Sequence, residues 1–217
     1  MNTRREFLET TFKLLAGAGA LLGSLAWPVR WTHSASTRIL LPRGTKRESL
    51  INRDPKSLDT RNLKIIPLKD FGTMGAADFE VDLDKWRLEV AGRVEAPLQL
   101  TYSEILSLPS IERNVLLICP GFFANYGRWR GVSMRDLLEE AAMESSFTHI
   151  VFSGGAKNSY ERKFPVADVL SNRVFLAYRV NGKTLPIKHG FPLRIVAEGY
   201  NGSDWIKYVN RMSVERA

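Results

Sequence analysis

The chain has a single cysteine, Cys119, among its 217 residues. One thiol excludes an internal disulfide, a zinc site built from cysteines and an iron–sulfur cluster held by cysteines. It also excludes covalent c-type haem, whose attachment motif needs two cysteines. Histidine is scarce as well, with three in the chain. The sequence lacks both a Walker lysine motif and a Gly-x-Gly-x-x-Gly fingerprint, so it does not indicate a nucleotide-binding fold.

The N-terminus resembles an export signal. Arg4 and Arg5 precede a charge-free run, Leu14 to Trp27, that is rich in alanine, glycine and leucine and ends at Pro28. A basic start with a short apolar run is typical of such signals, and paired arginines are typical of the twin-arginine type, which carries folded proteins. The run is shorter than the about 20 residues of a spanning helix. We expect residues 1–35 to be a twin-arginine export signal or an uncleaved anchor, rather than a buried amphipathic helix.

This interpretation predicts a periplasmic or otherwise extracytoplasmic protein that engages the twin-arginine export machinery. It also makes nucleic acid an unexpected partner. The chain has 31 Lys and Arg against 23 Asp and Glu, a net charge of +8, of which the first thirty residues contribute +2. The remaining charge fits either a solvated basic surface or a basic face that attracts an oxyanion substrate or an acidic cytochrome.

Beyond the leader, residues 36–56 form a polar, basic lead-in without helical periodicity, and residues 57–217 have the length of one domain. Short strands predominate and do not alternate regularly with helices, which predicts an α+β fold with predominantly β content. The expected strands are 86–90, 113–118, 149–152, 174–180, 193–196 and 206–214, and the expected helices are 102–108 and a second one capped by Ser133.

Cys119 lies where an apolar strand runs into Pro120-Gly121, which continues neither a helix nor a sheet. Lone cysteines are commonly small buried hydrophobic residues, but in an exported protein a spare thiol is liable to oxidation. The next ten residues, 122–131, combine aromatic and basic side chains, which suggests a surface loop that faces a ligand. If the thiol were a nucleophile it would need a histidine base, for which His189 is the serious candidate.

A second group of side chains lies within residues 185–207. His189, Arg194 and Lys207 occur there with glycines on both sides of one expected strand. Glycine lets the backbone approach a ligand closely, and cations with backbone donors bind phosphate. A pair of solvated basic turns would have the same composition. A third group, residues 58–63, indicates by itself only a turn.

Taken in order, these groups resemble the molybdopterin-binding domain of the sulfite oxidase family, which includes the periplasmic methionine-sulfoxide reductase catalytic subunit. The matching segments span about residues 57–214. They are 115–119, 128–132 with 137–138, 175–186, His-Gly-Phe-Pro-Leu-Arg at 189–194, Gly-Tyr-x-Gly at 199–202 and Trp-Ile-Lys at 205–207. The resemblance implies the sulfite-oxidase-type fold in a single domain.

The resemblance also implies roles for individual residues. Cys119 would give its thiolate to molybdenum, and Arg61 would help to hold an anionic substrate beside the metal. The implied cofactor is molybdenum–molybdopterin in its mononucleotide-free form. Contacts to the pterin and its phosphate would come from Asn62, Ser153, His189, Arg194, Trp205, Ile206 and Lys207.

The function that follows from the resemblance is that of an exported molybdenum-dependent oxidoreductase. It would transfer an oxygen atom to or from a small substrate, either a sulfite-like oxyanion or a sulfoxide. The sequence shows no haem domain, so electrons would be exchanged with a membrane haem protein or a soluble cytochrome. Two alternatives are a metal-free binding or scaffold protein that keeps the fold, and a hydrolase using Cys119 and His189, for which no nucleophile elbow is present.

Overall fold

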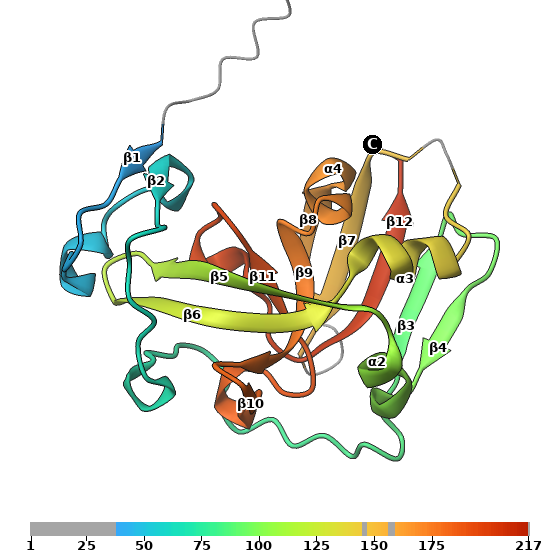
Figure 1. The fold of residues 1–217 in the computed structure, drawn as a ribbon. Helices are drawn as coiled ribbons and strands as arrows, with labels where there is room; N and C mark the ends of the chain where they lie inside the picture. The colour runs from blue at the N-terminus through green and yellow to red at the C-terminus, as the bar shows by residue number, and fades with distance from the viewer. Residues whose placement is uncertain (1–37, 145–146, 156–158, 217) are drawn as a thin grey trace, which may run out of the picture. The chain divides into compact units, whose positions relative to one another are not determined.

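Two five-stranded sheets organise the described part of the chain, which comprises residues 38–144, 147–155 and 159–216 of a computed structural model (Figure 1). The predicted export segment, residues 1–35, lies outside the described residues. Strands predominate over helices, so the predicted α+β fold with mainly β content is confirmed. In the part of the chain that the structure describes, no helix has the length and apolar character needed to cross a membrane.

The first sheet is antiparallel and contains the residues on both sides of Cys119. Its strands run in the order β10, β9, β6 and β5, and β11 also pairs with β9. The bounds of these strands are β5 (Ser110–Cys119), β6 (Phe123–Val132), β9 (Val174–Val180), β10 (Lys183–Thr184) and β11 (Arg194–Ala197).

The second sheet is mixed, with the order β4, β3, β12, β7 and β8. The pairing of β3 with β12 is parallel and the other pairings are antiparallel. A separate two-stranded parallel sheet joins β1 (Ile39–Leu40) to β2 (Leu58–Asp59). The bounds in the second sheet are β3 (Leu88–Gly92), β4 (Leu98–Leu100), β7 (His149–Gly154), β8 (Tyr160–Pro165) and β12 (Val209–Glu215).

The two predicted helices are present, and their N-cap residues are Thr101 and Ser133, of which Ser133 makes no capping hydrogen bond through its side chain. In α2 (Tyr102–Ser107), the Thr101 side chain accepts a hydrogen bond from the Glu104 backbone, and the Glu104 carboxylate accepts one from the Thr101 backbone, which completes the capping box. In α3 (Met134–Glu140), Leu137 and Leu138 are buried. The third α-helix, α4 (Val166–Leu170), was not predicted.

One predicted loop is wrong. Residues 122–131 largely form β6, which pairs with β5 along its whole length and with β9 on its other side. Tyr126 and Trp129 are buried in this strand, whereas Arg128 and Arg130 are exposed. Trp129 faces the main core, whereas Tyr126, Arg128 and Arg130 share the other face, which is covered at Tyr126 and open at the two arginines, so the composition reflects a partly covered strand rather than a loop that faces a ligand.

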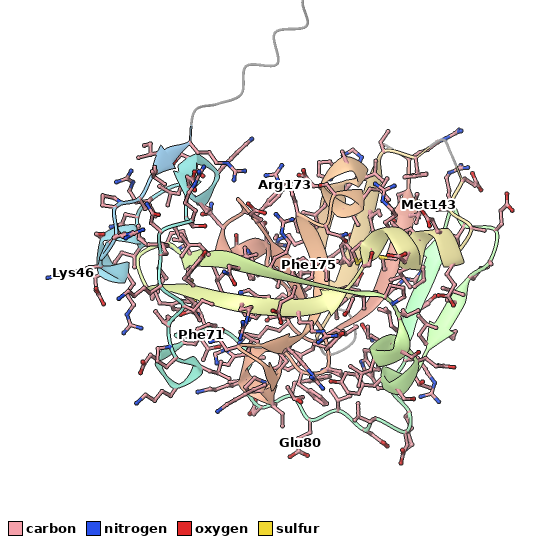
Figure 2. The ribbon with its side chains drawn as sticks, in the orientation of Figure 1. Lys46, Phe71, Glu80, Met143, Arg173 and Phe175 are labelled. Carbon is pink, nitrogen blue, oxygen red and sulfur yellow. The ribbon has the colours of Figure 1, made fainter. Side chains whose placement is uncertain are left out.

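The half of the β5–β6 hairpin nearest its turn is covered on both faces, which explains why β5 ends in an uninterrupted apolar run. Val115 and Leu117 belong to the main core between the two sheets, together with the fully buried Phe175 at the centre of the molecule (Figure 2). Leu116 and Ile118, which alternate with them, belong to a second cluster with Leu41 and Leu50 of the lead-in and with Leu58 of β2.

The lead-in and the residues that follow it form three short 3₁₀ turns and one strand pair, and the first two turns pack against the hairpin. Figure 1 shows these blue and cyan segments gathered beside the turn that joins β5 and β6. The Gly121 N–H in that turn donates a hydrogen bond of 3.1 Å to the Ile51 carbonyl. The 3₁₀ turns are η1 (Arg47–Leu50), η2 (Pro55–Ser57) and η3 (Leu68–Asp70).

Candidate active site

A cavity of about 380 Å³ lies at the end of β5. That volume falls within the about 300–1,000 Å³ of typical ligand sites. Four parts of the chain line it: residues 72–76, the turn after β5, the start of β8, and residues 202–208 with Arg194 from β11. Residues 72–76 are called the strap below. The cavity thus joins loops that are separated by as many as 136 positions in the sequence.

Cys119 is the last residue of β5 and lies on the same face of the strand as Val115 and Leu117, so its thiol reaches the cavity. Its sulfur lies 3.9 Å from the Met74 sulfur of the strap. Burial raises the pKa of the Cys119 thiol. The thiol is therefore protonated at neutral pH unless a metal binds it, since a bound metal ion deprotonates a coordinating thiol.

Lys207 holds the strap in place across the cavity. Its Nζ donates hydrogen bonds to Thr73 Oγ1 at 2.8 Å and to the carbonyls of Met74 and Ala76, each at 2.9 Å. A side chain at Gly72 would place its Cβ 2.4 Å from the ring of Phe123, so glycine is required for this close approach. Burial, and secondarily the charge of Arg194, lower the pKa of Lys207 to about 8.

Arg194 is the buried cation of the site, 4% exposed. It donates hydrogen bonds to the carbonyls of His189 at 3.0 Å and Trp205 at 3.3 Å. Its guanidinium carbon lies 5.3 Å from the ring centroid of Trp129 and 5.6 Å from that of Trp205, which is cation–π geometry. Burial lowers the pKa of Arg194 to about 10, so it stays charged at neutral pH.

His189 ends the 3₁₀ turn η5 (Ile187–His189) and is 1% exposed. Its ring meets the edge of Phe71 at a centroid distance of 5.9 Å. Burial lowers the pKa of His189 to about 4, with further lowering by the charges of Arg194, Lys188 and Lys207. The imidazole is therefore neutral at pH 7.

This pKa predicts that the free energy of unfolding depends on pH. As the pH falls from 6.5 to about 4, His189 takes up a proton in the unfolded chain before it does so in the folded protein. Stability should therefore be lost over that interval, by about 3 kcal/mol. Urea unfolding of the cofactor-free protein from pH 7 to 4 measures the loss. His189→Gln should lose about 3 kcal/mol less than the wild type, because it lacks the imidazole. Carboxylates such as Glu104 titrate in both proteins and account for the loss that remains. Parallel pH profiles would contradict the assignment.

Three buried polar atoms of this region lack a hydrogen-bond partner. They are His189 Nε2, Arg194 Nε and Trp205 Nε1, out of five such side-chain atoms in the described residues. Buried polar atoms are rarely left unpaired, so a group of them beside a cavity indicates a bound ligand rich in acceptors. A guanidinium and ring N–H donors suit a phosphate and a polar heterocycle.

The structure brings together most of the residues expected at the site. Cys119, Arg194, Trp205, Ile206 and Lys207 all line the cavity. His189 adjoins it through its hydrogen bond from Arg194.

Ser153 lies in β7 and is buried. Its hydroxyl is 3.5 Å from the Glu161 carboxylate, and it is not among the described residues that line the cavity. Nor does the described structure pair Cys119 with His189, as a cysteine nucleophile would require: Cys119 Sγ contacts Met74, and His189 Nε2 has no partner.

Arg61 and Asn62 are not brought to the cavity. Arg61 is 74% exposed and pairs with Asp59, and Asn62 donates a hydrogen bond to the Leu41 carbonyl at 3.2 Å. The neighbouring Leu58 packs on Leu116 and Ile118, the face of β5 opposite to that of Cys119. The segment that reaches the cavity is instead the strap, about ten residues later in the chain.

Four parts of the lining were not predicted from the sequence: the strap, Tyr160, Arg162 and Tyr208. Gly72 and Gly75 were the available signal for the strap, because paired glycines permit close backbone approach. Tyr126 lines a second cavity of about 190 Å³ beneath the lead-in.

Comparison with known proteins places these residues in a family. The family model described as "Oxidoreductase molybdopterin binding domain" matches residues 74–217. An NADH nitrate reductase of Lotus japonicus is 30% identical over 162 residues, which are 60% of this chain and 18% of that protein. The mitochondrial sulfite oxidase of Rattus norvegicus is 29% identical over 163 residues, 62% of this chain and 30% of that protein.

Two bacterial proteins extend the comparison. The uncharacterized oxidoreductase YuiH of Bacillus subtilis is 30% identical over 121 residues, 55% of this chain and 60% of that protein. The sulfane dehydrogenase SoxCD of Paracoccus pantotrophus shares the fold, with a TM-score of 0.61 and 21% identity over 91% of this chain and 55% of that chain. In each case this chain spans less than two thirds of the relative's length.

The unpaired atoms of His189, Arg194 and Trp205 beside the thiol of Cys119 fit the group that such relatives bind, since they offer a soft metal ligand and donors for a pterin phosphate. The family match covers well over half of the chain and includes every lining residue from Met74 onward. The chain therefore belongs to the molybdopterin-binding oxidoreductase domains of the sulfite oxidase and nitrate reductase type.

Proposed function

We propose that the protein is an exported molybdenum-dependent oxidoreductase that transfers an oxygen atom to or from a small substrate. The observation that carries this proposal is the position of Cys119, whose thiol reaches the same cavity as the unpaired donors of Arg194 and Trp205. One end of that cavity offers a soft ligand for a metal, and the donors offer binding to an anion.

The residues present could hold molybdenum–molybdopterin in its mononucleotide-free form. Cys119 would supply its thiolate to the metal, and the unpaired atoms of His189, Arg194 and Trp205 would bind the pterin and its phosphate. Lys207 would orient the strap over the cavity through its three hydrogen bonds. When bound, this group supplies oxygen-atom transfer coupled to two one-electron transfers.

The reaction balances as substrate plus water giving oxygenated substrate, two protons and two electrons, or as the reverse. The lining near Cys119 offers apolar contacts from Met74 and Phe123 and a cation, Arg162, whose Nε lies 3.3 Å from Asp204. This mixed lining suits a small substrate with a polar oxygen, either a sulfite-like oxyanion or a sulfoxide.

The electrons would be exchanged with a separate haem protein, either membrane-bound or a soluble cytochrome. The paired arginines and the apolar run of residues 1–35 support export through the twin-arginine machinery, with the signal cleaved or kept as an anchor. Export of a folded protein is consistent with insertion of the cofactor before transport.

The test is metal analysis of the full chain purified from a host that makes molybdopterin. We expect about one molybdenum per chain and an electron paramagnetic resonance signal with a cysteine sulfur in the coordination sphere. The same chain from a host without pterin synthesis is the control and should contain no molybdenum. Absence of the metal while the pathway is intact would reject the enzyme and favour the metal-free scaffold.

A further inference from the structure

The net positive charge of the described protein is concentrated in one segment. Residues 38–69, called the basic segment here, contain nine Lys and Arg but three Asp and Glu. Residues 70–217 contain 18 of each kind and are neutral overall. All nine cations of the basic segment are exposed. The charge excess beyond the leader is therefore not spread evenly over a solvated surface.

Most of these cations have no partner within the described structure. Three form ion pairs, Arg38 with Glu198, Arg47 with Glu48 and Arg61 with Asp59. Lys46 projects from the edge of the molecule into solvent (Figure 2). The six without an ion pair in the described residues are Arg43, Lys46, Arg53, Lys56, Lys64 and Lys69.

The basic segment borders the loops that form the cavity. Ile51 accepts the hydrogen bond of Gly121, two residues after Cys119. The Cα of Lys56 lies 3.6 Å from where a Cβ on Gly199 would be, close to the cavity-lining residues 202–208. The stretch from Ile51 to Lys56, which includes Arg53, is thus held against the turn after Cys119 and the loop before the lining residues.

Exposed apolar side chains occur in the turn after Cys119 and in the cavity lining. Phe122, in the turn after Cys119, is 67% exposed. Met74 and Tyr160, which line the cavity, are 45% and 53% exposed. An apolar centre flanked by charge is the composition of a transient protein interface, in which electrostatic attraction speeds encounter.

We propose that the basic segment and Phe122 form the docking surface for an acidic electron-transfer protein, namely a soluble haem protein with carboxylates around its exposed haem edge. The proposal rests on the proposed function, because a partner docked here would bring its haem next to the turn after Cys119. Each oxygen atom transferred to substrate would reduce two partner molecules by one electron each, with two protons released to water, or the reverse. An anionic lipid surface would also attract the cations but would not need them beside the cavity.

The experiment uses the molybdenum-loaded full chain and a triple variant, Arg43→Glu/Lys46→Glu/Arg53→Glu. The protein is reduced chemically, mixed with an oxidised acidic c-type cytochrome, and followed by haem absorbance, so that no substrate is needed. Association of the two proteins is measured in parallel by calorimetry at low ionic strength. The matched control reverses three exposed cations elsewhere, in Arg135→Glu/Arg179→Glu/Lys183→Glu.

We expect the triple variant to lower the bimolecular rate constant at least about tenfold at low salt, within the range that electrostatic steering covers. The difference should shrink to less than about twofold in 1 M salt, where the Debye length is about 3 Å. The control variant should stay within about twofold of the wild type. Electron transfer to a small neutral dye should be unchanged in both variants, because the cavity itself is intact.

Equal cytochrome rates and affinities in the wild type and the triple variant would overturn the docking surface. A second result would also overturn it: the wild type binds vesicles of anionic phospholipid, the triple variant does not, and the cytochrome rate is the same in both. That result would assign the cations to a membrane surface. Failure of the proposed function differs from both: the chain would lack molybdenum and dye turnover. Charge-dependent association with the cytochrome in that case would still support the docking surface.

Discussion

Cys119→Ala is expected to abolish oxygen-atom transfer and leave the fold intact. If the thiolate is a ligand of the metal, its loss removes an interaction worth several kcal/mol in the transition state, which corresponds to at least about a 10³-fold loss of kcat. The free energy of unfolding should change by less than about 1 kcal/mol, because the side chain is small, partly exposed and lies at the end of a strand. Steady-state kinetics and urea unfolding measure the two effects.

The matched control for this variant is Met74→Leu. Met74 contributes the sulfur nearest to the Cys119 thiol, at 3.9 Å, yet it has no role as a metal ligand in the proposal. This variant should keep its molybdenum and most of its activity. Activity retained by Cys119→Ala at more than about a tenth of the wild-type value would refute the ligand assignment, as would equal losses in the two variants.

Trp129→Ala is expected to cost about 3–5 kcal/mol of stability, the range for large aromatic side chains in cores. Trp129 is fully buried, its Nε1 donates a hydrogen bond to the Val115 carbonyl at 3.3 Å, and its ring packs 5.5 Å from that of Trp205. Its ring centroid also lies 5.3 Å from the guanidinium carbon of Arg194, so its removal takes away one of the two aromatic contacts of that cation. Urea unfolding of the cofactor-free protein measures the loss.

Leu138→Ala is the control that separates a damaged site from a merely weakened fold. Leu138 is fully buried in α3 and is not among the described residues lining the cavity, and its truncation should cost about 2–5 kcal/mol. At a temperature where both variants are folded, Trp129→Ala should retain less molybdenum than Leu138→Ala. Equal metal contents, or a cost below about 1 kcal/mol for Trp129→Ala, would contradict the role given to this ring.

The local features of the site were predictable where neighbouring residues decide them. Pro120 and Gly121 end a strand wherever it lies in the fold, so the position of Cys119 at a strand end could be read from the sequence. The capping box of Thr101 and Glu104 likewise depends on a spacing of three residues. In contrast, residues 122–131 were misread as a loop, because β6 forms by pairing with β5 and β9 and its Tyr126 and Trp129 are buried in two different clusters, which composition does not reveal.

From the sequence alone, the family followed from the resemblance of the ordered motifs around Cys119, His189, Arg194 and Trp205. The mainly β fold followed from side-chain alternation and turn residues, which act over a few positions. Only the tertiary structure decided which segment closes the cavity. Lys207 binds the strap across more than 130 positions of the chain, whereas Arg61 is exposed beside Asp59 and Asn62 donates a hydrogen bond to Leu41, so that neither is among the residues that line the cavity. Such meetings of distant loops depend on how the sheets stack, and no local pattern specifies them.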